Sequence, residues 1–428
     1  MLPALKKFLE SDNDGTFFVG HASVLARIDH KLIMIDFVRN INFFLDSWFF
    51  FPKLEWSNDL IKKLDYVFIS HSHDDHFDPI LLEKLPKNIK IFFPDKRIGF
   101  SKFLNKNKSR VTLVPAFKEF KIDNTISVMA IPSDHNKIDS SYLIKGSNFS
   151  VYHGNDNFLT PSIVGKAVQK MGGANHAYIP FAYVWWYPFC LTSITSKRRM
   201  SEGKRLALKN MKIGAEISNY LNPEVIVPFA ANMVYYDPKS VINKETANTF
   251  DFSSFCRKNY PNLYKKVLNL FPGDYVIKNY SGNTIESKNL SRHAYFLKLK
   301  GFLNKRTKLF NKEHRNFIFN EKNKYLTNYR KKLNRLKKVK LDREIYITVK
   351  NNRSKFMKID SIKKNISFHN NVRKKNNSYI FYFEPKPLLS WLKGNVSFED
   401  ILNSQRFTVE RYPEEFRPKI WDYVRENL

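Results

Sequence analysis

The sequence has few cysteines and no long apolar run, and each lack excludes a class of protein. The 428 residues include 2 cysteines, Cys190 and Cys256, which are too few for a disulfide scaffold, a four-cysteine zinc site or a cysteine-ligated iron–sulfur cluster. No stretch approaches the roughly 18 uncharged apolar residues of a membrane-spanning helix. The start, MLPALKKFLESDNDG, reaches charged residues too soon for a signal peptide. We therefore expect a soluble, cytoplasmic protein.

Acidic residues are also in the minority, with 40 Asp and Glu against 72 Lys and Arg, a formal net charge of +32. The excess is concentrated between Lys298 and Lys375, where 26 basic residues face 5 acidic ones. Such a stretch attracts the phosphate of nucleic acid, anionic lipid or a phosphorylated substrate. Lys and Asn are abundant throughout, as in proteins of AT-rich genomes, and no RNA- or DNA-binding motif accompanies the stretch. The charge therefore allows nucleic acid as a partner, but no sequence motif supports it.

Short strands and helices alternate over residues 15–275 and predict an α/β (α+β) fold in which two sheets are flanked by helices. The run YVFIS at residues 66–70 predicts a strand, and helices are expected over Arg97–Leu104 and Ser201–Leu221. A hydrophobic fraction of 43% is enough to bury a sizeable core. We expect a catalytic domain over residues 1–275, a basic region of unclear structure over 276–378, and a helical segment over 379–428.

The chemistry concentrates in the six residues HSHDDH (71–76), directly after the predicted strand YVFIS. Neutral imidazole binds Zn²⁺ or Fe²⁺, and carboxylates add harder oxygen ligands. In an extended segment His71 and His73 point to the same side and can share one ion, while Asp75 and His76 can face a second ion. The motif predicts one or two divalent metal ions, zinc or iron.

This H-x-H-x-D-H pattern resembles the signature of the metallo-β-lactamase superfamily. The segment FVGHASVLARIDHKLIMIDF (18–37) is similar to the opening hairpins of that fold. The resemblance implies an αββα sandwich, here with a basic, partly helical C-terminal extension. The motif is specific for the fold and weakly specific for the reaction, because the fold hosts hydrolases, nucleases and oxygenases.

Downstream segments resemble the catalytic domain of CMP-N-acetylneuraminate hydroxylases. The likeness rests on VYHGNDNFLT (151–160), on the basic helix KRRMSEGKRLALKN (197–210), on LNPEVIVPFAANMVYYDPKSVINKET (221–246), and on Trp-Leu…Asp-Ile-Leu near the end. Those enzymes carry a Rieske iron–sulfur domain, whose ligands are Cys-x-His and Cys-x-x-His. Neither cysteine of this sequence neighbours a histidine in that way. An oxygenase reaction would therefore require a separate electron-transfer partner.

The resemblance extends to further ligands. His135 matches the superfamily's third histidine, and Asp156 matches its bridging carboxylate. The late histidine that many two-metal hydrolases of this fold carry is missing, because the corresponding strand ends in PFAAN (228–232). The second site would then hold Asp75, His76 and Asp156 with water. The predicted metal ligands are His71, His73, Asp75, His76, His135 and Asp156, of which Asp75, His76 and Asp156 are the predicted catalytic residues.

Substrate contacts are predicted around this centre. His153 and Asn155 flank Asp156 and are expected to orient ligands. The aromatic stretch Tyr183–Phe189 is a candidate pocket wall or a core segment, and Lys197–Arg199 is a candidate phosphate grip or a solvated cluster. The predicted substrate-binding residues are His21, His153, Asn155, Trp185, Trp186 and Asn232, with packing beneath the metal loop as the alternative for His21.

These observations favour a metal-dependent hydrolase that uses metal-activated water on an anionic substrate, such as a phosphorylated, nucleotide-sugar or glycan-related molecule. The alternative is an iron-dependent hydroxylase like the sialic acid hydroxylases. A nuclease is the second alternative, supported by the basic stretch and opposed by the lack of additional late histidine motifs. A degenerate site with an anion-binding tail is a third, and the intact motif argues against it.

Overall fold

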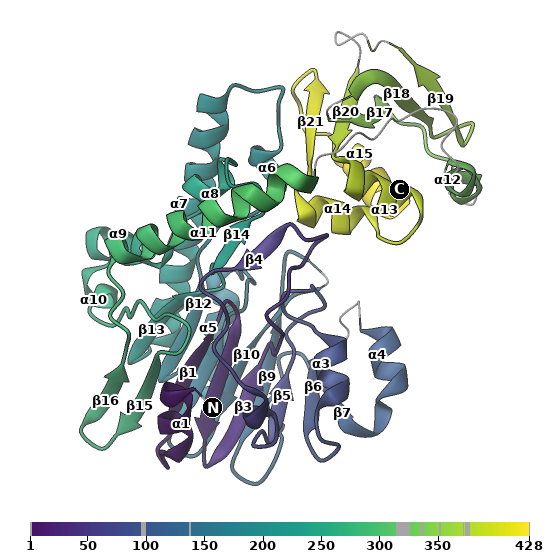
Figure 1. Ribbon diagram of the computed structural model, residues 1–428. Coiled ribbons are helices and arrows are strands. Elements are labelled where there is room, and N and C mark those ends of the chain that lie inside the picture. Colours follow the sequence, from purple (N-terminus) through teal and green to yellow (C-terminus); the bar gives the residue numbers. More distant parts are fainter. Residues whose placement is uncertain are drawn as a thin grey trace.

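The computed structural model describes residues 2–95, 100–136, 138–313, 326–334, 338–350, 352–370, 372 and 377–427. Two sheets pack face to face with helices outside them, as an αββα sandwich (Figure 1). The first sheet has the order β16-β15-β1-β2-β3-β5-β6-β7 and the second the order β13-β12-β11-β10-β9-β8. The fold class expected from the sequence is confirmed.

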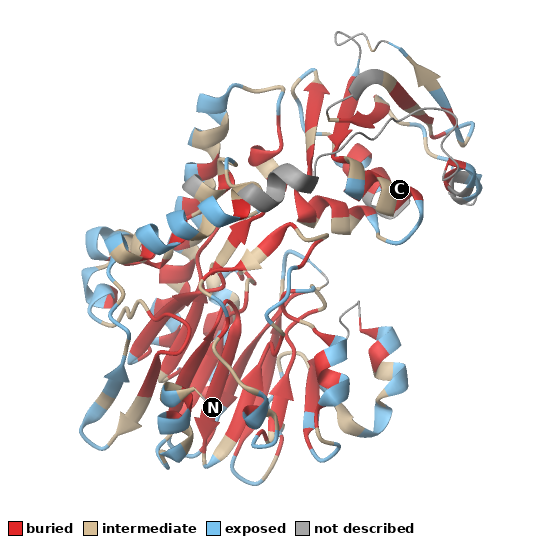
Figure 2. Ribbon diagram, viewed as in Figure 1, coloured by how far each residue is buried: buried red, intermediate tan, exposed pale blue. Residues whose placement is uncertain are grey.

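The sandwich strands are short and mostly buried, as Figure 2 shows. The first sheet comprises β1 (Gly15–Gly20), β2 (Ser23–Ile28), β3 (Lys31–Ile35), β5 (Tyr66–Phe68), β6 (Lys90–Pro94), β7 (Val111–Val114), β15 (Tyr275–Asn279) and β16 (Gly282–Glu286). The second comprises β8 (Phe120–Lys121), β9 (Ser127–Pro132), β10 (Ser140–Lys145), β11 (Ser150–His153), β12 (His176–Pro180) and β13 (Val225–Phe229). A small ribbon pairs β4 (Trp48–Phe50) with β14 (Met233–Tyr235).

Helices cover the outer faces and link the strands. The predicted helix Ser201–Leu221 is α7 (Ser196–Leu221), which begins earlier because the Thr195 hydroxyl caps it by accepting from the Arg198 N–H. Residues 97–99 of the predicted helix Arg97–Leu104 lie outside the described residues, and α4 begins at Ser101. The other helices of the sandwich are α1 (Pro3–Glu10), α2 (Asn58–Ile61), α3 (Pro79–Lys84), α4 (Ser101–Lys106), α5 (Pro161–Met171), α6 (Trp186–Phe189), α8 (Ile242–Glu245), α9 (Thr249–Asn259) and α10 (Pro261–Tyr264).

The core between the two sheets fixes the strand that precedes the HSHDDH motif. Phe68 on β5 stacks on Phe92 with ring centroids 4.6 Å apart, and Tyr142 of the opposite sheet packs edge-on against Phe68 at 5.2 Å. The Tyr142 hydroxyl donates to the Ile69 carbonyl at 2.9 Å. Both sheets therefore hold the chain immediately before the HSHDDH motif. This packing restricts the directions in which the side chains of the motif point.

A C-terminal unit, residues 326–427, forms a second globular part at one end of the sandwich (Figure 1). Its sheet has the order β19-β18-β17-β20-β21. Before it, α11 (Arg292–Glu313) packs Tyr295 and Leu299 against Phe51 of the sandwich. The unit comprises α12 (Leu326–Asn334), β17 (Glu344–Val349), β18 (Asn352–Asp360), β19 (Asn365–His369), β20 (Ser378–Phe383), α13 (Pro385–Leu392), α14 (Phe398–Ser404), β21 (Phe407–Tyr412) and α15 (Pro418–Asn427).

The elements associate across the predicted boundaries at 275 and 378. Strands β15 and β16 join the first sheet beside β1, and β17 pairs in parallel with β20. Among the described residues, the region of unclear structure thus supplies β16, β17, β18, β19 and nearly all of β15, and the segment expected to be helical supplies β20 and β21. Pairing between strands distant in sequence depends on tertiary contacts, which local patterning does not reveal.

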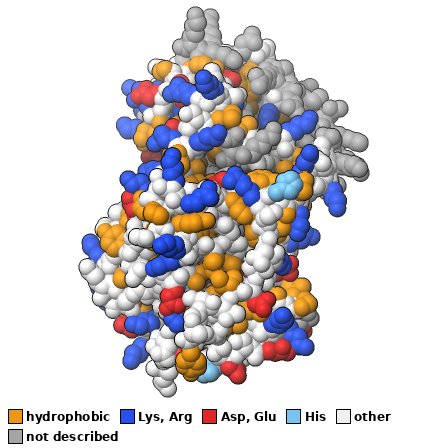
Figure 3. All heavy atoms as spheres, turned by 90° about the vertical axis from the view of Figure 1, so that its left-hand side faces the viewer, with side chains coloured by type: hydrophobic (Ala, Val, Ile, Leu, Met, Phe, Trp, Pro, Cys, Tyr) orange, Lys and Arg blue, Asp and Glu red, His pale blue; other side chains and the backbone are white. Residues whose placement is uncertain are grey.

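Part of the basic stretch has an internal role. The buried Arg343 donates to the Pro413 carbonyl at 2.7 Å and pairs with Glu415 at 2.9 Å. The buried Arg306 guanidinium lies over the Phe49 ring, 4.2 Å from its centroid. On the face in Figure 3, Lys and Arg side chains are scattered among hydrophobic and uncharged ones. None of the described helices is long and apolar enough to cross a membrane.

A buried ion pair joins the C-terminal unit to the sandwich. The Arg406 Nε donates to the Glu384 carboxylate at 2.9 Å, and both side chains are nearly inaccessible. The same guanidinium donates to the Leu45 carbonyl at 3.0 Å and lies 4.4 Å from the centroid of the Tyr236 ring. The Tyr236 hydroxyl in turn donates to Glu384. This cluster therefore ties the two parts of the chain together.

We expect Arg406→Met to lower the free energy of unfolding by about 3 kcal/mol, because it leaves the Glu384 charge buried with only Lys350, at 3.6 Å, as a cation. Thermal denaturation followed by circular dichroism measures the effect. The matched control is Lys358→Met, which breaks a half-exposed pair with Glu344 and should cost no more than about 1 kcal/mol. Equal losses in the two variants would contradict a structural role for the buried pair.

Candidate metal centre

Strand direction brings the candidate ligands to one end of the sandwich. Strands β3 and β5 are parallel, so Asp36 after β3 and His71 after β5 emerge at the same edge. In the opposite sheet β10 and β11 are antiparallel, so Asp139 before β10 and Asp156 after β11 also meet there. His21 occupies the turn of the β1–β2 hairpin. The fold therefore gathers residues that are far apart in sequence.

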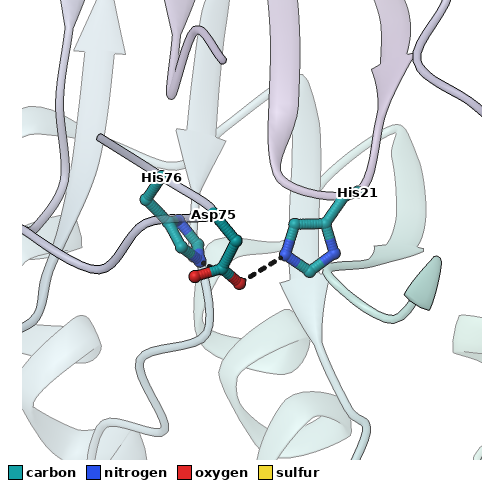
Figure 4. Close-up of side chains that lie close together, drawn as sticks. All are labelled: His21, Asp75 and His76. Carbon is teal, nitrogen blue, oxygen red and sulfur yellow. Dashed lines mark hydrogen bonds and ion pairs between the residues drawn. The ribbon is translucent and has the colours of Figure 1, made fainter. Parts of the chain in front are cut away.

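One group is a buried chain of alternating carboxylates and imidazoles (Figure 4). The His76 Nδ1 lies 2.8 Å from the Asp36 carboxylate, which also accepts from the Ser70 hydroxyl at 2.7 Å. On its other side, the His76 Nε2 lies 3.5 Å from Asp75 Oδ2. The same oxygen lies 3.0 Å from the His21 Nε2. Asp36 thus orients His76 and leaves its Nε2 facing the other ligands.

The second group is centred on His71. Its Nε2 lies 2.8 Å from the His73 Nδ1, 3.8 Å from Asp139 Oδ1 and 3.6 Å from Asp156 Oδ1. The other oxygen of Asp156 lies 3.8 Å from the His76 Nε2. Asp156 therefore stands between the two groups, where one carboxylate can bridge two ions.

Several of these atoms are buried without a hydrogen-bond partner among the described residues, namely the His76 Nε2, Asp139 Oδ1 and Asp156 Oδ1. A buried polar atom without a partner lowers the stability of the fold. The convergence of three such atoms on one place therefore indicates a binding site for an ion. Three sets of residues each hold three ligand atoms within 4.8 Å of one another. The donor atoms fit divalent metal. The sets are His21–Asp75–His76, His71–His76–Asp156 and His71–His73–Asp139.

The protonation of the metal-free centre follows from burial and neighbouring charge. Burial lowers the pKa of His71 to about 4, so this imidazole is neutral at pH 7. Burial also opposes a charge on His76, but the carboxylates of Asp75, Asp156 and Asp36 outweigh it and raise the pKa of His76 well above its usual value. Burial raises the pKa of Asp156 to about 6. The centre therefore holds exchangeable protons where a metal would bind.

The structure does not bring His135 into the centre, in contrast to the sequence-based expectation. Its side chain is 61% exposed and its Nε2 lies 3.5 Å from Asp134. The loop turns the Asp139 carboxylate inward instead, where its Oδ1 faces His71. The residues predicted as ligands that do converge are His71, His73, Asp75, His76 and Asp156.

The structure separates the predicted substrate-binding residues. His21 joins a candidate metal group together with Asp75 and His76. His153 donates to the Ala22 carbonyl at 2.8 Å, and the Asn155 amide donates to the Ser140 carbonyl, so both support loops. Asn232 is buried, and its carbonyl accepts from the Phe51 N–H at 3.0 Å. His153, Asn155 and Asn232 do not line the pocket to which His73, Asp139 and Asp156 contribute.

This pocket, called the metal pocket below, has a volume of about 330 Å³ and is lined by residues of both parts of the chain. Trp185, one of the predicted substrate residues, lines it, whereas Trp186 does not. Glu399 on α14 of the C-terminal unit contributes to the wall. Other lining residues include His73, Asp139, Asp156, Phe158, Tyr183, Asn210 and Ala230.

Two residues were missed by the sequence analysis, Asp139 and Asp36. Each is a carboxylate at a strand end, Asp36 after β3 and Asp139 before β10. That position was the available signal, because polar residues at strand ends on one edge of a sandwich tend to meet. A histidine in the same loop, His135, was the stronger but misleading feature.

Comparisons with known proteins agree with this architecture. Residues 17–163 match the family described as the beta-lactamase superfamily domain. A protein of Mycolicibacterium smegmatis described as a putative Rieske 2Fe-2S iron–sulfur protein is 25% identical over 235 residues, which is 52% of this chain and 44% of that protein. The chain thus spans less than half the length of this relative.

Solved structures with detectable similarity include enzymes of more than one kind. The diiron beta-hydroxylase CmlA from Streptomyces venezuelae has a TM-score of 0.36 and 17% identity over 51% of this chain and 45% of its own. The metallo hydrolase Igni18 from Ignicoccus hospitalis has a TM-score of 0.41 and 18% identity over 63% and 99%. Likeness at this level leaves the reaction to be argued from the residues themselves. The match over residues 17–163 and the αββα sandwich thus agree on a metallo-β-lactamase-like fold.

Proposed function

We propose that this chain is the catalytic part of an iron-dependent oxygenase acting on an anionic organic substrate. The observation that carries the proposal is the donor set formed by His71, His73 and Asp139. Two imidazoles and one carboxylate are typical of non-haem iron oxygenases, whereas three histidines would favour zinc. The exchange of His135 for Asp139 thus changes the preferred reaction from the hydrolysis that the sequence favoured.

The reaction also requires electrons. Insertion of one oxygen atom of O₂ into a C–H bond, with the other released as water, consumes two electrons and two protons. The relative from Mycolicibacterium smegmatis is described as a putative Rieske iron–sulfur protein, and most of its length lies outside the match. We infer that a Rieske-type cluster on another polypeptide segment or protein reduces this centre. The two cysteines, Cys190 and Cys256, are buried and far apart in sequence, so they would not bind such a cluster.

The chain's own residues would hold and protect the reacting centre. Bound iron would supply activation of dioxygen. Asp36 would hold the His76 ring in place through its 2.8 Å contact with Nδ1. Asp156, which lines the pocket, would carry a proton between the centre and the substrate. Tyr183 and Trp185 would limit the access of water to the pocket.

Zinc-dependent hydrolysis is the second candidate. The specific observation in its favour is the place of Asp156, whose two oxygens face His71 at 3.6 Å and His76 at 3.8 Å. A carboxylate in this position can take a proton from water activated by two ions. The metal content of the protein separates the two reactions.

Protein purified without oxygen should contain about one to two iron ions per chain, because two imidazoles and one carboxylate form the donor set that is typical of non-haem iron. Elemental analysis measures the metal, and an oxygen electrode measures O₂ uptake after addition of a chemical reductant. The matched control is a His71→Ala, His73→Ala double variant, which should lose both iron and uptake. Stoichiometric zinc, without iron and without O₂ uptake, would contradict the oxygenase and favour the hydrolase.

Asp139→Asn should weaken metal binding at least about tenfold, because it removes the charged oxygen ligand beside His71. His135→Ala should leave the metal content unchanged, since that side chain points to solvent. Both variants are made in the same loop and are compared by elemental analysis after dialysis against a weak chelator. The opposite pattern, with metal lost from His135→Ala alone, would restore His135 as the ligand.

Metal affinity should rise with pH by about tenfold per unit near neutrality for each proton released. His76 is protonated in the metal-free protein because its pKa is raised, and it must lose that proton to bind an ion held together with His71 and Asp156. His71, with a pKa of about 4, releases none at pH 7. Titration calorimetry between pH 6.5 and 7.5, about one unit, in buffers of different ionisation enthalpy measures the proton release. Binding that is independent of pH would contradict this protonation state.

A further inference from the structure

A second cavity of about 550 Å³ lies between the sandwich and the C-terminal unit. It adjoins the metal pocket, because Tyr183 and Trp185 line both. Its remaining wall comes from α6 and α7 on one side and from α14, β21 and α15 on the other. One molecule can therefore occupy this cavity while reaching into the metal pocket.

Backbone hydrogen bonds hold the two walls in register. The Val409 N–H on β21 donates to the Cys190 carbonyl at 2.8 Å, and the Thr192 N–H donates to the Val409 carbonyl at 3.0 Å. The segment after α6 thus pairs with the C-terminal sheet as a short parallel bridge at Leu191. The cavity is a fixed feature of the fold rather than a loose contact between two domains.

Aromatic faces dominate this cavity. Trp186 and Trp421, one from each wall, stack with ring centroids 4.2 Å apart and planes inclined by 27°. Phe416 continues the stack on Trp421 at 6.2 Å and 16°. Within the stack, Trp186 and Trp421 are each 4% exposed, whereas Phe416 is 54% exposed. Trp185, another residue of the wall, is 40% exposed. The exposed faces of Phe416 and Trp185 suit a planar ring.

The same cavity contains buried donors without acceptors. The Arg411 side chain is only 4% exposed, and one of its nitrogens donates to Glu414. Its Nε and Nη1, and the Trp421 Nε1, have no hydrogen-bond partner among the described residues. Buried donors of this kind are normally satisfied, and a charged guanidinium most of all. These atoms are inaccessible to solvent, and the Arg411 side chain also interacts with the Tyr379 hydroxyl, so Arg411 contributes positive charge to the wall.

The charges in the wall favour an anion. Arg198, at the start of α7, and Arg411 outnumber the single carboxylate, Glu414. Of the predicted phosphate grip, Arg199 is used internally, since it donates to the Leu191 carbonyl at 2.8 Å. Arginine binds phosphate and carboxylate through two parallel hydrogen bonds. Arg198 is exposed, so it is the wall arginine that a ligand in the cavity reaches directly.

We propose that this cavity is a recognition subsite for a planar ring that carries an anionic group. The ring lies against the exposed faces of Phe416 and Trp185, and the anion accepts from Arg198, with the positive charge of Arg411 behind it. The part of the molecule that reacts extends past Trp185 into the metal pocket. This last step rests on the proposed function, whereas binding of the ring and the anion needs no metal.

The test uses the full-length protein after removal of metal with a chelator. The probes are the four ribonucleoside 5′-monophosphates and phenyl phosphate, which combine a ring with an anion, and adenosine and ribose 5-phosphate, which offer one part each. Quenching of tryptophan fluorescence and titration calorimetry measure binding. At least one combined probe should bind with a Kd below about 1 mM, and adenosine and ribose 5-phosphate should each bind at least about tenfold more weakly than it.

Three variants locate the binding. Arg411→Met and Arg198→Ala should each weaken binding of the combined probe by at least about tenfold, because each removes a charged donor. Phe416→Ala, an exposed position that should not disturb folding, should weaken it through loss of ring contact. The controls are Arg292→Ala and Tyr264→Ala, an exposed arginine and an exposed tyrosine outside this cavity, which should leave binding unchanged.

Failure of all five combined probes to bind would overturn the subsite. Binding that survives Arg198→Ala and Phe416→Ala would also overturn it, and these two variants keep the test valid if Arg411→Met does not fold. The proposed function fails separately. A protein that contains zinc alone but binds the probes as expected would lose the oxygenase reaction and keep the subsite.

Discussion

Burial of charge at one end of the sandwich is the constraint on which the rest of the structure depends. Asp36, Asp75 and His76 are almost completely inaccessible, and a buried charge is tolerated only when it is paired or bound to metal. Their arrangement alternates carboxylate with imidazole, so each group stabilises the next. Loops from both sheets must reach this point together, which explains why strand ends so far apart in sequence are brought to one edge.

The C-terminal unit is part of this environment. Glu399 on α14 closes the metal pocket, and the bridge at Leu191 and Val409 joins the unit's sheet to the sandwich. The Arg406–Glu384 pair buries further charge at the same junction. The pocket beside the metal ligands is therefore built by two parts of the chain, and neither part alone would define its shape.

The sequence predicted the sandwich, and it singled out most of the residues that the fold gathers as candidate metal ligands, because the strongest signals are local. The motif at residues 71–76 is contiguous, and its strand, β5, has a clear β-branched and aromatic run. The exchange of His135 for Asp139 was not predictable in the same way. Which side chain of the 133–139 loop turns inward depends on packing against the opposite sheet. The sheet of the C-terminal unit was missed because β17 and β20 pair across 28 or more residues of irregular composition.

The junction between the two parts also has a consequence for how such proteins diversify. The candidate metal ligands among the described residues belong to the sandwich, whereas half of the wall of the neighbouring cavity belongs to the last hundred residues. Substitutions in α14, β21 or α15 can change which molecules are admitted without touching a single ligand. Proteins that share the HSHDDH motif can therefore catalyse the same type of reaction on different substrates. The carboxyl-terminal sequence is where such differences in substrate are expected.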